Sequence, residues 1–227
     1  MVQAYLILNN IGKRGNFGTL IRSAAAMGIQ DIFVVGAEKL RTFGNQVCIT
    51  ARIDYTCWFR QKRFISVSQN TLSKCRLHYW NTLVELKEFL QSRDIKVVGI
   101  EIDDKSTALT ETDFTNQDIA FMLGNEGTGM NAKQKQICDS FVYIEHFSGA
   151  TASLNVAVAG GIVFHRYAIQ NSKATQKRDG QKYVVQESVA EFEDLSQPNR
   201  GREYHRHDPA DLSDLDLSFG GLERNED

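Results

Sequence analysis

The sequence predicts an α/β protein built on a mostly parallel sheet that helices cover on both faces. Short apolar runs, each of the length of a buried strand, recur along the first 170 residues. Between them lie segments whose apolar residues recur at helical spacing. Strands that alternate with helices in this way are typical of parallel sheets, because each crossover places a helix against a face of the sheet.

The expected elements follow from these runs and from their flanking residues. Strands are expected at residues 2–8, 31–36, 76–80, 95–102, 119–123 and 141–144. Helices are expected at residues 19–27 and 153–168. Two more are expected in between, one with Asn81 as its N-cap and one that begins near Asn131. A glycine-rich turn over residues 12–18 precedes the first of these helices, and Gly28 follows it as a C′ glycine does. The last helix is apolar around most of its circumference, so we expect it to be buried.

The character of the sequence changes after about Gln170. Residues 171–227 carry 8 Lys and Arg against 13 Asp and Glu, a net charge of −5, and both prolines. Such a segment buries too little apolar surface to offset its ordering entropy, so we expect a domain over 1–170 and a largely disordered tail over 171–227. Within the tail, Tyr183-Val-Val185 is either a short strand or a docking peptide.

Residues 1–170 carry 18 basic against 15 acidic side chains, a net charge of +3. This balance fits a polyanionic partner and equally fits ordinary surface charge. The four cysteines (Cys48, Cys57, Cys75 and Cys138) show no metal-ligand spacing, which predicts reduced thiols, no metal and a cytoplasmic protein. The apolar run at 2–8 is too short to cross a bilayer, and we expect neither a signal peptide nor a membrane span.

Three segments carry polar residues in settings that ordinary folding does not fully explain. In the first, residues 16–28, Arg22 stands in a helix of small apolar residues. A buried guanidinium without a partner is costly, so Arg22 either pairs with a core carboxylate or reaches the surface. The functional alternative is an Arg held for a phosphate or a ribose, which its planar fork of donors suits.

The second segment, Phe121–Met130, ends a strand in three glycines within six residues, Gly124, Gly127 and Gly129. Such a backbone can approach a ligand closely and expose its amide groups. It is not a P-loop, because no Gly-Lys-Ser/Thr follows, and its glycine spacing is not that of a dinucleotide fingerprint. Taken alone, a structural turn explains it equally well.

The third segment, residues 144–156, leads from a strand through a loop of small residues to Ser153-Leu154-Asn155. Ser153 is explained as a helix N-cap, a role worth about 1 kcal/mol. Capping and helix propensity do not explain Asn155 just inside the helix. We therefore interpret Asn155 as a ligand-contacting group that offers both a donor and an acceptor.

In this order and spacing, the three segments resemble the signature motifs of the SpoU/TrmH family of knotted RNA methyltransferases, in the SPOUT superfamily. The family pattern is Asn-x-Gly…Arg, then Gly-Asn-Glu-Gly-x-Gly, then Ile…Ser-Leu-Asn-Val, and the resemblance spans roughly residues 3–168. Glu145 stands where the family commonly carries Pro, and Gly15 precedes Asn16 where a Pro is frequent. Both departures concern the conformation of loops.

The resemblance implies a C-terminal trefoil knot, a homodimer with its sites at the subunit interface, and S-adenosylmethionine as the cofactor. It implies methyl transfer to a ribose 2′-hydroxyl of RNA, with the cofactor held by Leu123, Gly124, Asn125, Gly127, Ile144, Ser153, Leu154 and Asn155. The catalytic residues that it implies are Asn16, Arg22, Glu126, Ser153 and Asn155, with Asn16 and Glu126 near the ribose. In the family this Arg is proposed as the base, assisted by a substrate phosphate. Since Arg ordinarily stays protonated, we expect Arg22 chiefly to position phosphate and ribose.

Two other interpretations stay open. A non-catalytic RNA-binding protein would have no need to keep Arg22, Asn125-Glu126 and Ser153-Leu-Asn155 together, and Arg22 favours ribose over methylation of a base nitrogen. We expect RNA to contact Lys13, Arg14 and the basic and aromatic stretch Trp58–Phe64, although an amphipathic surface strand explains that stretch almost as well. No separate N-terminal RNA-binding domain is expected.

Compact members of the family often modify tRNA. The resemblance therefore favours tRNA over rRNA as the substrate.

Overall fold

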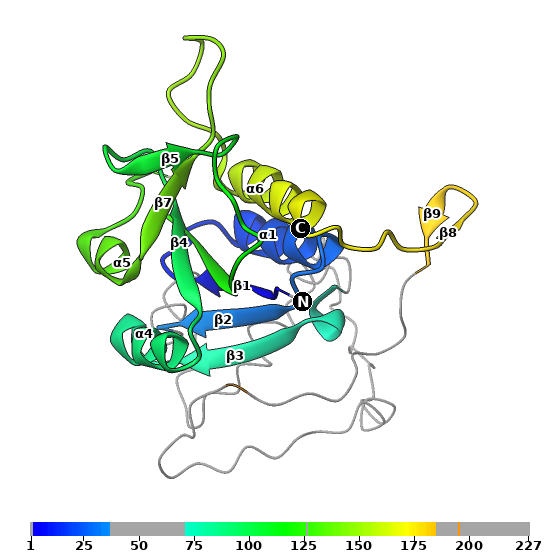
Figure 1. Cartoon of the computed structure of the whole chain (residues 1–227), viewed down its shortest axis with the longest axis horizontal. Helices are drawn as coiled ribbons and strands as arrows, with labels where there is room; N and C mark the ends of the chain where they lie inside the picture. Colours follow the sequence, from blue (N-terminus) through cyan, green and yellow to red (C-terminus); the bar gives the residue numbers. More distant parts are fainter. Residues whose placement is uncertain (1, 37–70, 126, 185–194, 196–227) are drawn as a thin grey trace, which may run out of the picture. The chain divides into compact units, whose positions relative to one another are not determined.

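The computed structural model describes residues 2–36, 71–125, 127–184 and 195 (Figure 1). The chain divides into two compact units, Met1–Gln197 and Pro198–Asp227. All described residues belong to the first unit.

A seven-stranded sheet forms the centre of this unit, in the order β3-β2-β1-β6-β4-β7-β5. Each pairing between neighbouring strands is parallel, which confirms the predicted mostly parallel α/β sheet. The central strands β1 and β6 are buried at every position, as expected where helices cover both faces. The strands are β1 (Ala4–Leu8), β2 (Asp31–Val35), β3 (Arg76–Trp80), β4 (Lys96–Ile100), β5 (Ser106–Ala108), β6 (Ile119–Leu123) and β7 (Ser140–Tyr143).

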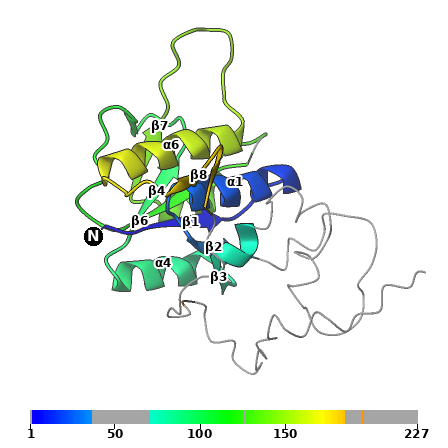
Figure 2. The same ribbon diagram turned by 90° about the vertical axis from the view of Figure 1, so that its right-hand side faces the viewer.

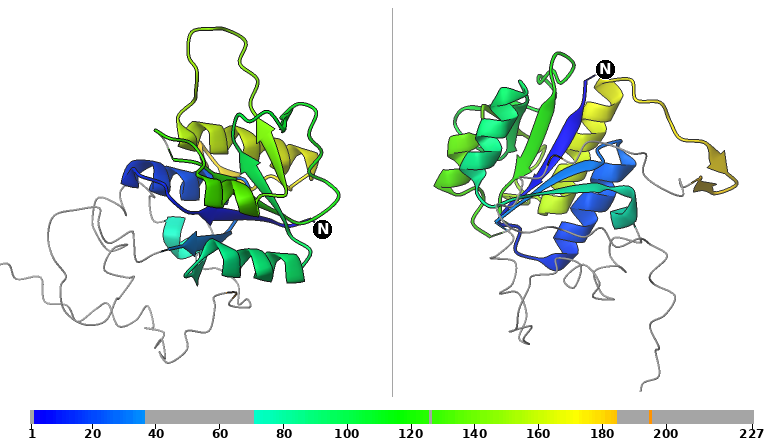
Figure 3. Two further views of the ribbon diagram at one scale, coloured as in Figure 1. Left: turned by 90° about the vertical axis from the view of Figure 1, so that its left-hand side faces the viewer. Right: turned by 90° about the horizontal axis from the view of Figure 1, so that it is seen from below.

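Helices lie on both faces of the sheet (Figures 1 and 3). Helices α1 (Arg14–Ala26) and α6 (Val156–Gln170) cover one face, and α4 (Leu83–Ser92) and α5 (Ala132–Ile137) cover the other. Side chains alternate across a strand, so β1 contributes to two cores. Leu6 and Leu8 belong to the core under α1 and α6, whereas Tyr5 and Ile7 belong to the core under α4 and α5. A 3₁₀ turn, η2 (Thr71–Lys74), precedes β3.

Helices α1 and α6 lie side by side, although they come from opposite ends of the domain (Figure 2). Gly160 of α6 permits this approach, because a Cβ added there would lie 2.6 Å from a methyl carbon of Leu20 on α1. The far end of α6 is anchored by Tyr167, a fully buried residue whose hydroxyl donates to the Val2 carbonyl at 3.0 Å. The expected burial of this helix is thus confirmed for the face that meets α1.

The starts of α1 and α4 differ from the prediction. The first helix begins at Arg14 instead of residue 19, so most of the glycine-rich segment forms its first turn. The next helix is capped by Thr82 and not by Asn81: Thr82 Oγ1 accepts from the Glu85 N–H at 3.2 Å, and Glu85 accepts from the Thr82 N–H at 3.1 Å. These two reciprocal bonds satisfy the backbone N–H groups of Thr82 and Glu85, and the helix therefore starts after Thr82. Gly28 follows the first helix in the left-handed region, with φ 79°, as expected.

Strand β5 was not predicted, because its three residues, Ser-Thr-Ala, form no apolar run. Beyond α6, β8 (Arg178–Asp179) and β9 (Lys182–Tyr183) form a small antiparallel hairpin, so Tyr183 lies in a short strand, one of the two alternatives considered.

Burial raises the pKa of the Cys75 and Cys138 thiols to about 12, and both are free; Cys48 and Cys57 lie outside the described residues. Within the described ranges, no helix has the length and apolar character needed to cross a membrane.

Candidate functional site

A pocket of about 210 Å³ lies at the carboxyl ends of β4, β6 and β7. Ligand sites in parallel α/β sheets form at this edge, because the loops that leave the strands converge there. The residues that follow β4 form one wall of the pocket, and the glycine turn after β6, Gly124–Gly129, forms a second. The loop after β7 and the start of α6 form the rest of the lining. The lining residues include Ile100, Glu101, Ile102, Leu123, Gly124, Asn125, Gly127, Gly129, Ile144, His146, Ser153, Leu154 and Val156.

The pocket brings together most residues expected to hold a cofactor. Seven of them line it: Leu123, Gly124, Asn125, Gly127, Ile144, Ser153 and Leu154. The eighth, Asn155, does not line the pocket. The second and third motifs therefore meet in one cavity, although 13 residues of helix and strand, 131–143, separate them along the chain.

The glycine turn has a closed geometry that two of its glycines make possible. Asn125 and Gly129 exchange backbone hydrogen bonds, each of 2.9 Å. Gly129 has φ 67°, and a Cβ on Gly124 would lie 2.4 Å from the carbonyl carbon of Gly129. Gly127 has more room, since the nearest atom to an added Cβ is 3.7 Å away. The glycines at 124 and 129 therefore serve the turn itself, and this turn forms a wall of the pocket.

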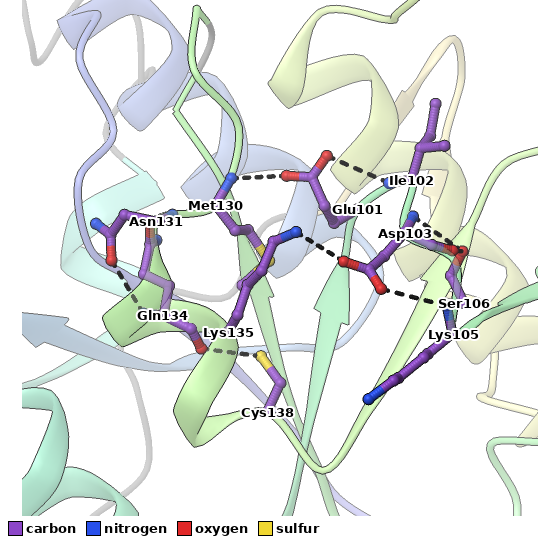
Figure 4. A network of polar contacts seen from close by, with 10 residues as sticks. All are labelled: Glu101, Ile102, Asp103, Lys105, Ser106, Met130, Asn131, Gln134, Lys135 and Cys138. Carbon is purple, nitrogen blue, oxygen red and sulfur yellow. Dashed lines mark hydrogen bonds and ion pairs between the residues drawn. The ribbon is translucent and has the colours of Figure 1, made fainter.

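Three side chains hold the turn in place, and Figure 4 draws two of them, Gln134 and Glu101. Asn125 Oδ1 accepts from the Gly127 N–H at 2.9 Å, and its Nδ2 donates to the Asn10 carbonyl at 3.1 Å. Gln134, which is fully buried, donates to the Leu123 carbonyl at 3.2 Å. Glu101 Oε2 accepts from the Met130 N–H at 2.7 Å.

Sequence reasoning missed Glu101 and Gln134, although both left a signal. Gln134 stands three residues after Asn131, and the two form a capping box at the start of α5, with bonds of 3.1 and 3.0 Å. Glu101 is a carboxylate near the end of the mainly apolar run Ile95–Ile102, which also contains Lys96. The run predicts a single strand, whereas β4 ends at Ile100 and the Glu101 carboxylate binds the Met130 N–H of the neighbouring loop.

The start of α6 corrects the interpretation of the third motif. The helix begins at Val156, so Asn155 is its N-cap and Ser153 is not. Asn155 Oδ1 accepts from the N–H groups of Ala157 and Val158, at 2.9 and 3.4 Å. Capping therefore does explain Asn155, because the helix starts three residues later than the pattern suggested. Its Nδ2 remains available and donates to Asn16 Oδ1 at 3.2 Å, which joins the first motif to the third.

Arg22 lies on the exposed surface of α1 and is not among the residues that line the pocket. Within the described ranges, its guanidinium forms no hydrogen bond or ion pair, so the structure selects the surface alternative over a core carboxylate partner. Lys13 is also exposed. Glu126, the side chain of Arg14 and the stretch 58–64 lie outside the described residues.

Glu145, which departs from the family pattern, anchors the loop after β7 through hydrogen bonds. Glu145 accepts hydrogen bonds from the side chain of Thr110, which follows β5, and from the Thr110 N–H. The hydrogen bond from the Thr110 hydroxyl lowers the pKa of the Glu145 carboxyl. At the position where the family pattern commonly has Pro, this chain thus carries a hydrogen-bonded carboxylate.

The described lining of the pocket contains few ionisable side chains. Among its described lining residues, Glu101 is the one carboxylate and His146 the one imidazole; Lys and Arg are absent. In the part of the chain that the structure describes, no cluster of His, Cys, Asp or Glu is placed to hold a metal ion.

Comparison with known proteins identifies relatives at the level of sequence and fold. The model of the SpoU rRNA Methylase family matches residues 40–165, more than half of the chain, and its match begins after the first motif. The 23S rRNA (guanosine-2′-O-)-methyltransferase RlmB of Acinetobacter baylyi is 31% identical over 162 residues, which are 70% of this chain. The chain spans 57% of that relative, little more than half of its length.

Two solved structures share the fold. The SpoU methyltransferase AviRb from Streptomyces viridochromogenes, in complex with AdoMet, matches with a TM-score of 0.58 and 22% identity, over 76% of this chain and 58% of AviRb. The TrmH/SpoU tRNA modifying enzyme of A. aeolicus matches with a TM-score of 0.57 and 20% identity, over 76% of each chain. The family match, together with the pocket formed by the second and third motifs, establishes that this chain belongs to the SpoU rRNA Methylase family.

Proposed function

We propose that the chain is an S-adenosylmethionine-dependent RNA methyltransferase that modifies a ribose 2′-hydroxyl. The observation that carries this proposal is the pocket at the end of the sheet. It gathers residues of the second and third motifs, and the bond between Asn155 and Asn16 places the first motif beside them. The related AviRb structure contains AdoMet, and the A. baylyi relative is named a guanosine-2′-O-methyltransferase.

The pocket fits the cofactor in shape and chemistry. Ile100, Ile144, Leu154 and Val156 supply apolar walls of the kind that a flat adenine base needs. The glycine turn brings its backbone close to the cavity, where amide groups can bind polar atoms of the ligand. The carboxylate of Glu101, with no Lys or Arg among the described lining residues, suits a cation such as a sulfonium.

Bound S-adenosylmethionine would supply an electrophilic methyl group, so the protein has to orient the hydroxyl and assist loss of its proton. Arg22 suits the first task, because an exposed guanidinium can bind a substrate phosphate and a ribose oxygen through its fork of donors. Asn16 and Asn155, which are bonded to each other, would hold the ribose beside the pocket. Ser153 and Glu126 complete the proposed catalytic set.

We further propose that the active form is a homodimer. Arg22 does not line the pocket of its own chain, so a second copy that presents its α1 would complete the site. Helix α6 carries exposed Val158, Ile162 and Ile169, at 52%, 39% and 59% exposure, which would become buried against such a copy. The proposed trefoil knot rests on the resemblance to knotted methyltransferases.

For the substrate we propose tRNA in preference to rRNA, and for the compartment a cytoplasm in which thiols stay reduced. Support for tRNA comes from the A. aeolicus relative, which is named a tRNA modifying enzyme, whereas the A. baylyi relative is named for 23S rRNA. The free thiols of Cys75 and Cys138 agree with a reducing compartment.

Methyl transfer from tritiated S-adenosylmethionine to total RNA tests the activity, and mapping of 2′-O-methylation in cells with and without the protein identifies the nucleotide. Label in tRNA at a ribose is the expected result. Label at a base would contradict ribose chemistry, and label in rRNA would contradict the tRNA assignment. RNA binding without any transfer would support a non-catalytic RNA-binding protein.

A further inference from the structure

We propose that Glu101 gives the cofactor pocket its preference for a positively charged ligand over the uncharged reaction product. The inference rests on the proposed function, since it takes S-adenosylmethionine as the ligand of this pocket. Glu101 belongs to none of the three motifs and follows directly after β4.

The carboxylate of Glu101 lies against the glycine turn (Figure 4). Its Oε2 accepts from the Met130 N–H at 2.7 Å, and its Oε1 accepts from the Ile102 N–H at 3.2 Å. The same Oε2 would lie 2.7 Å from a Cβ on Gly129 and 2.9 Å from a Cβ on Gly124. Glu101 therefore fixes the turn through one oxygen while its carboxylate lines the cavity.

No ion pair within the described residues neutralises this carboxylate. The nearby Lys135 points instead to Asp103, with Nζ 2.7 Å from Oδ2 (Figure 4). The two backbone N–H groups that bind Glu101 are neutral donors. Lys135 is near enough to interact electrostatically with Glu101, but without an ion pair the negative charge of Glu101 can still act on whatever occupies the pocket.

This charge distinguishes the cofactor from its product. S-adenosylmethionine carries a sulfonium cation, and after methyl transfer S-adenosylhomocysteine carries a neutral thioether; the amino-acid groups and the adenosine are the same in both. A carboxylate in a partly enclosed pocket therefore stabilises the first ligand more than the second. The protein would bind its cofactor selectively and release the spent product.

The experiment is calorimetric titration of the wild-type protein and of Glu101→Gln with three ligands: S-adenosylmethionine, S-adenosylhomocysteine and sinefungin. Sinefungin carries an amine, protonated at neutral pH, in place of the methyl sulfonium, so it tests charge independently of sulfur chemistry. Gln keeps an oxygen that can accept from the Met130 N–H, but it has no charge. We expect the ratio of the affinities for each cationic ligand and for S-adenosylhomocysteine to fall about fivefold or more in this variant.

Two further variants separate charge from architecture. The double variant Asp103→Asn/Lys135→Gln removes the neighbouring ion pair, whose two residues lie outside the described lining of the pocket, and should leave the ratio unchanged. Glu101→Asp keeps the charge on a shorter side chain that no longer reaches the Met130 N–H. It should weaken all three ligands together and retain the ratio, and thermal melting of each variant checks that it is folded.

Each outcome decides the proposal. An unchanged ratio in folded Glu101→Gln, or a ratio lost equally in the double variant Asp103→Asn/Lys135→Gln, overturns the specific role of Glu101. Should Glu101→Gln fail to fold, the wild-type protein still decides: equal affinity for the two cationic ligands and S-adenosylhomocysteine overturns the proposal. Wild-type protein that binds none of the three ligands contradicts instead the proposed function on which this inference depends.

Discussion

The Nδ2 of Asn155 donates a hydrogen bond to Oδ1 of Asn16 at 3.2 Å, between residues 139 positions apart in the sequence. The same Asn155 caps α6 with its oxygen. One amide therefore fixes the start of the helix with its acceptor and joins two motifs with its donor. This division of the amide makes its two roles separable by mutation.

Asn155→Asp should keep the cap and lose the contact to Asn16, because a carboxylate accepts from the Ala157 N–H but cannot donate. We expect its stability to stay near wild type, whereas Asn155→Ala should lose about 1 kcal/mol of unfolding free energy with the cap. Methyl transfer should fall at least about tenfold in both, since the link between the motifs is broken. Because Asn155 does not line the pocket, cofactor affinity should change little in the Asp variant. Denaturant unfolding, titration and a transfer assay check these points; wild-type activity in both variants would remove Asn155 from the site.

Arg22→Ala should lower methyl transfer by about 100-fold or more, because a group that positions the substrate is lost. Cofactor affinity should stay within a few-fold of wild type, since Arg22 does not line the pocket, and the melting temperature should not change, since its side chain is exposed. Arg22→Lys serves as the matched control, which keeps the charge and loses the planar fork. A collapse of cofactor affinity in a folded Arg22→Ala protein would contradict this division of labour.

Gly124→Ala should lower the free energy of unfolding by about 1–3 kcal/mol, because the added Cβ would lie 2.4 and 2.5 Å from backbone atoms of Gly129 and Met130. Gly127→Ala, in the same turn, should stay within about 0.5 kcal/mol of wild type, as its Cβ would meet nothing closer than 3.7 Å. Chemical denaturation compares the two variants. Equal losses would mean that the turn is not as tightly closed as its hydrogen bonds indicate.

Asp31 should make the protein sensitive to acid. Burial by itself would raise the pKa of the Asp31 carboxyl, but hydrogen bonds from Arg76 and His78 outweigh it and lower the pKa below its ordinary value. A carboxyl with a lowered folded-state pKa stabilises the fold above its unfolded pKa, and this contribution is lost as the pH falls through the folded pKa. The loss should therefore occur below about pH 4.

The comparison for this prediction is Asp31→Asn. Its stability at neutral pH should be lower than that of wild type, because Arg76 loses its charged partner. Between pH 5 and pH 2 its free energy of unfolding should fall less steeply than that of wild type. Parallel curves for the two proteins over this range would show that Asp31 does not carry the acid response.

A truncation after Gln197 should test whether the acidic C-terminal segment competes with RNA. Residues 198–227 carry 4 Lys and Arg against 8 Asp and Glu, a net charge of −4, most of the −5 of residues 171–227. Their removal should tighten RNA binding at low salt, with a difference that shrinks as salt screens charge over about 8–10 Å. RNA binding measured at two salt concentrations checks this; weaker binding at both would place the segment in the RNA site.

Truncation after Gln170 is the control for architecture, because it also removes contacts with the body. Asn171 donates to the Phe114 carbonyl at 3.1 Å, Lys173 to the Val2 carbonyl at 3.2 Å, and the Leu195 N–H to His78 Nδ1 at 3.0 Å. This shorter protein should melt at a lower temperature than the one that ends at Gln197. Sedimentation would show whether it also becomes monomeric, as expected if the hairpin around Tyr183 supports the dimer.

The sequence by itself determined the fold class, the order of most strands and helices, and the family. These features follow from short stretches of sequence. A continuous apolar run predicts the buried strand β6, and a glycine directly after a helix predicts the left-handed conformation of Gly28. The glycines at 124 and 129 were recognised for the same reason, because a tight turn demands them wherever it lies in the fold.

The tertiary structure decided which side chains meet. Glu101 reaches Met130 because β4 and β6 are adjacent strands, and Asn155 reaches Asn16 because α6 lies against α1. No spacing along the chain records either contact. The role of Asn155 was misjudged for a related reason: a cap depends on where the helix begins, and α6 begins where its apolar face first meets the sheet and α1, at Val156. Local patterns thus fixed what each segment is, and packing between distant segments fixed what its polar residues can do.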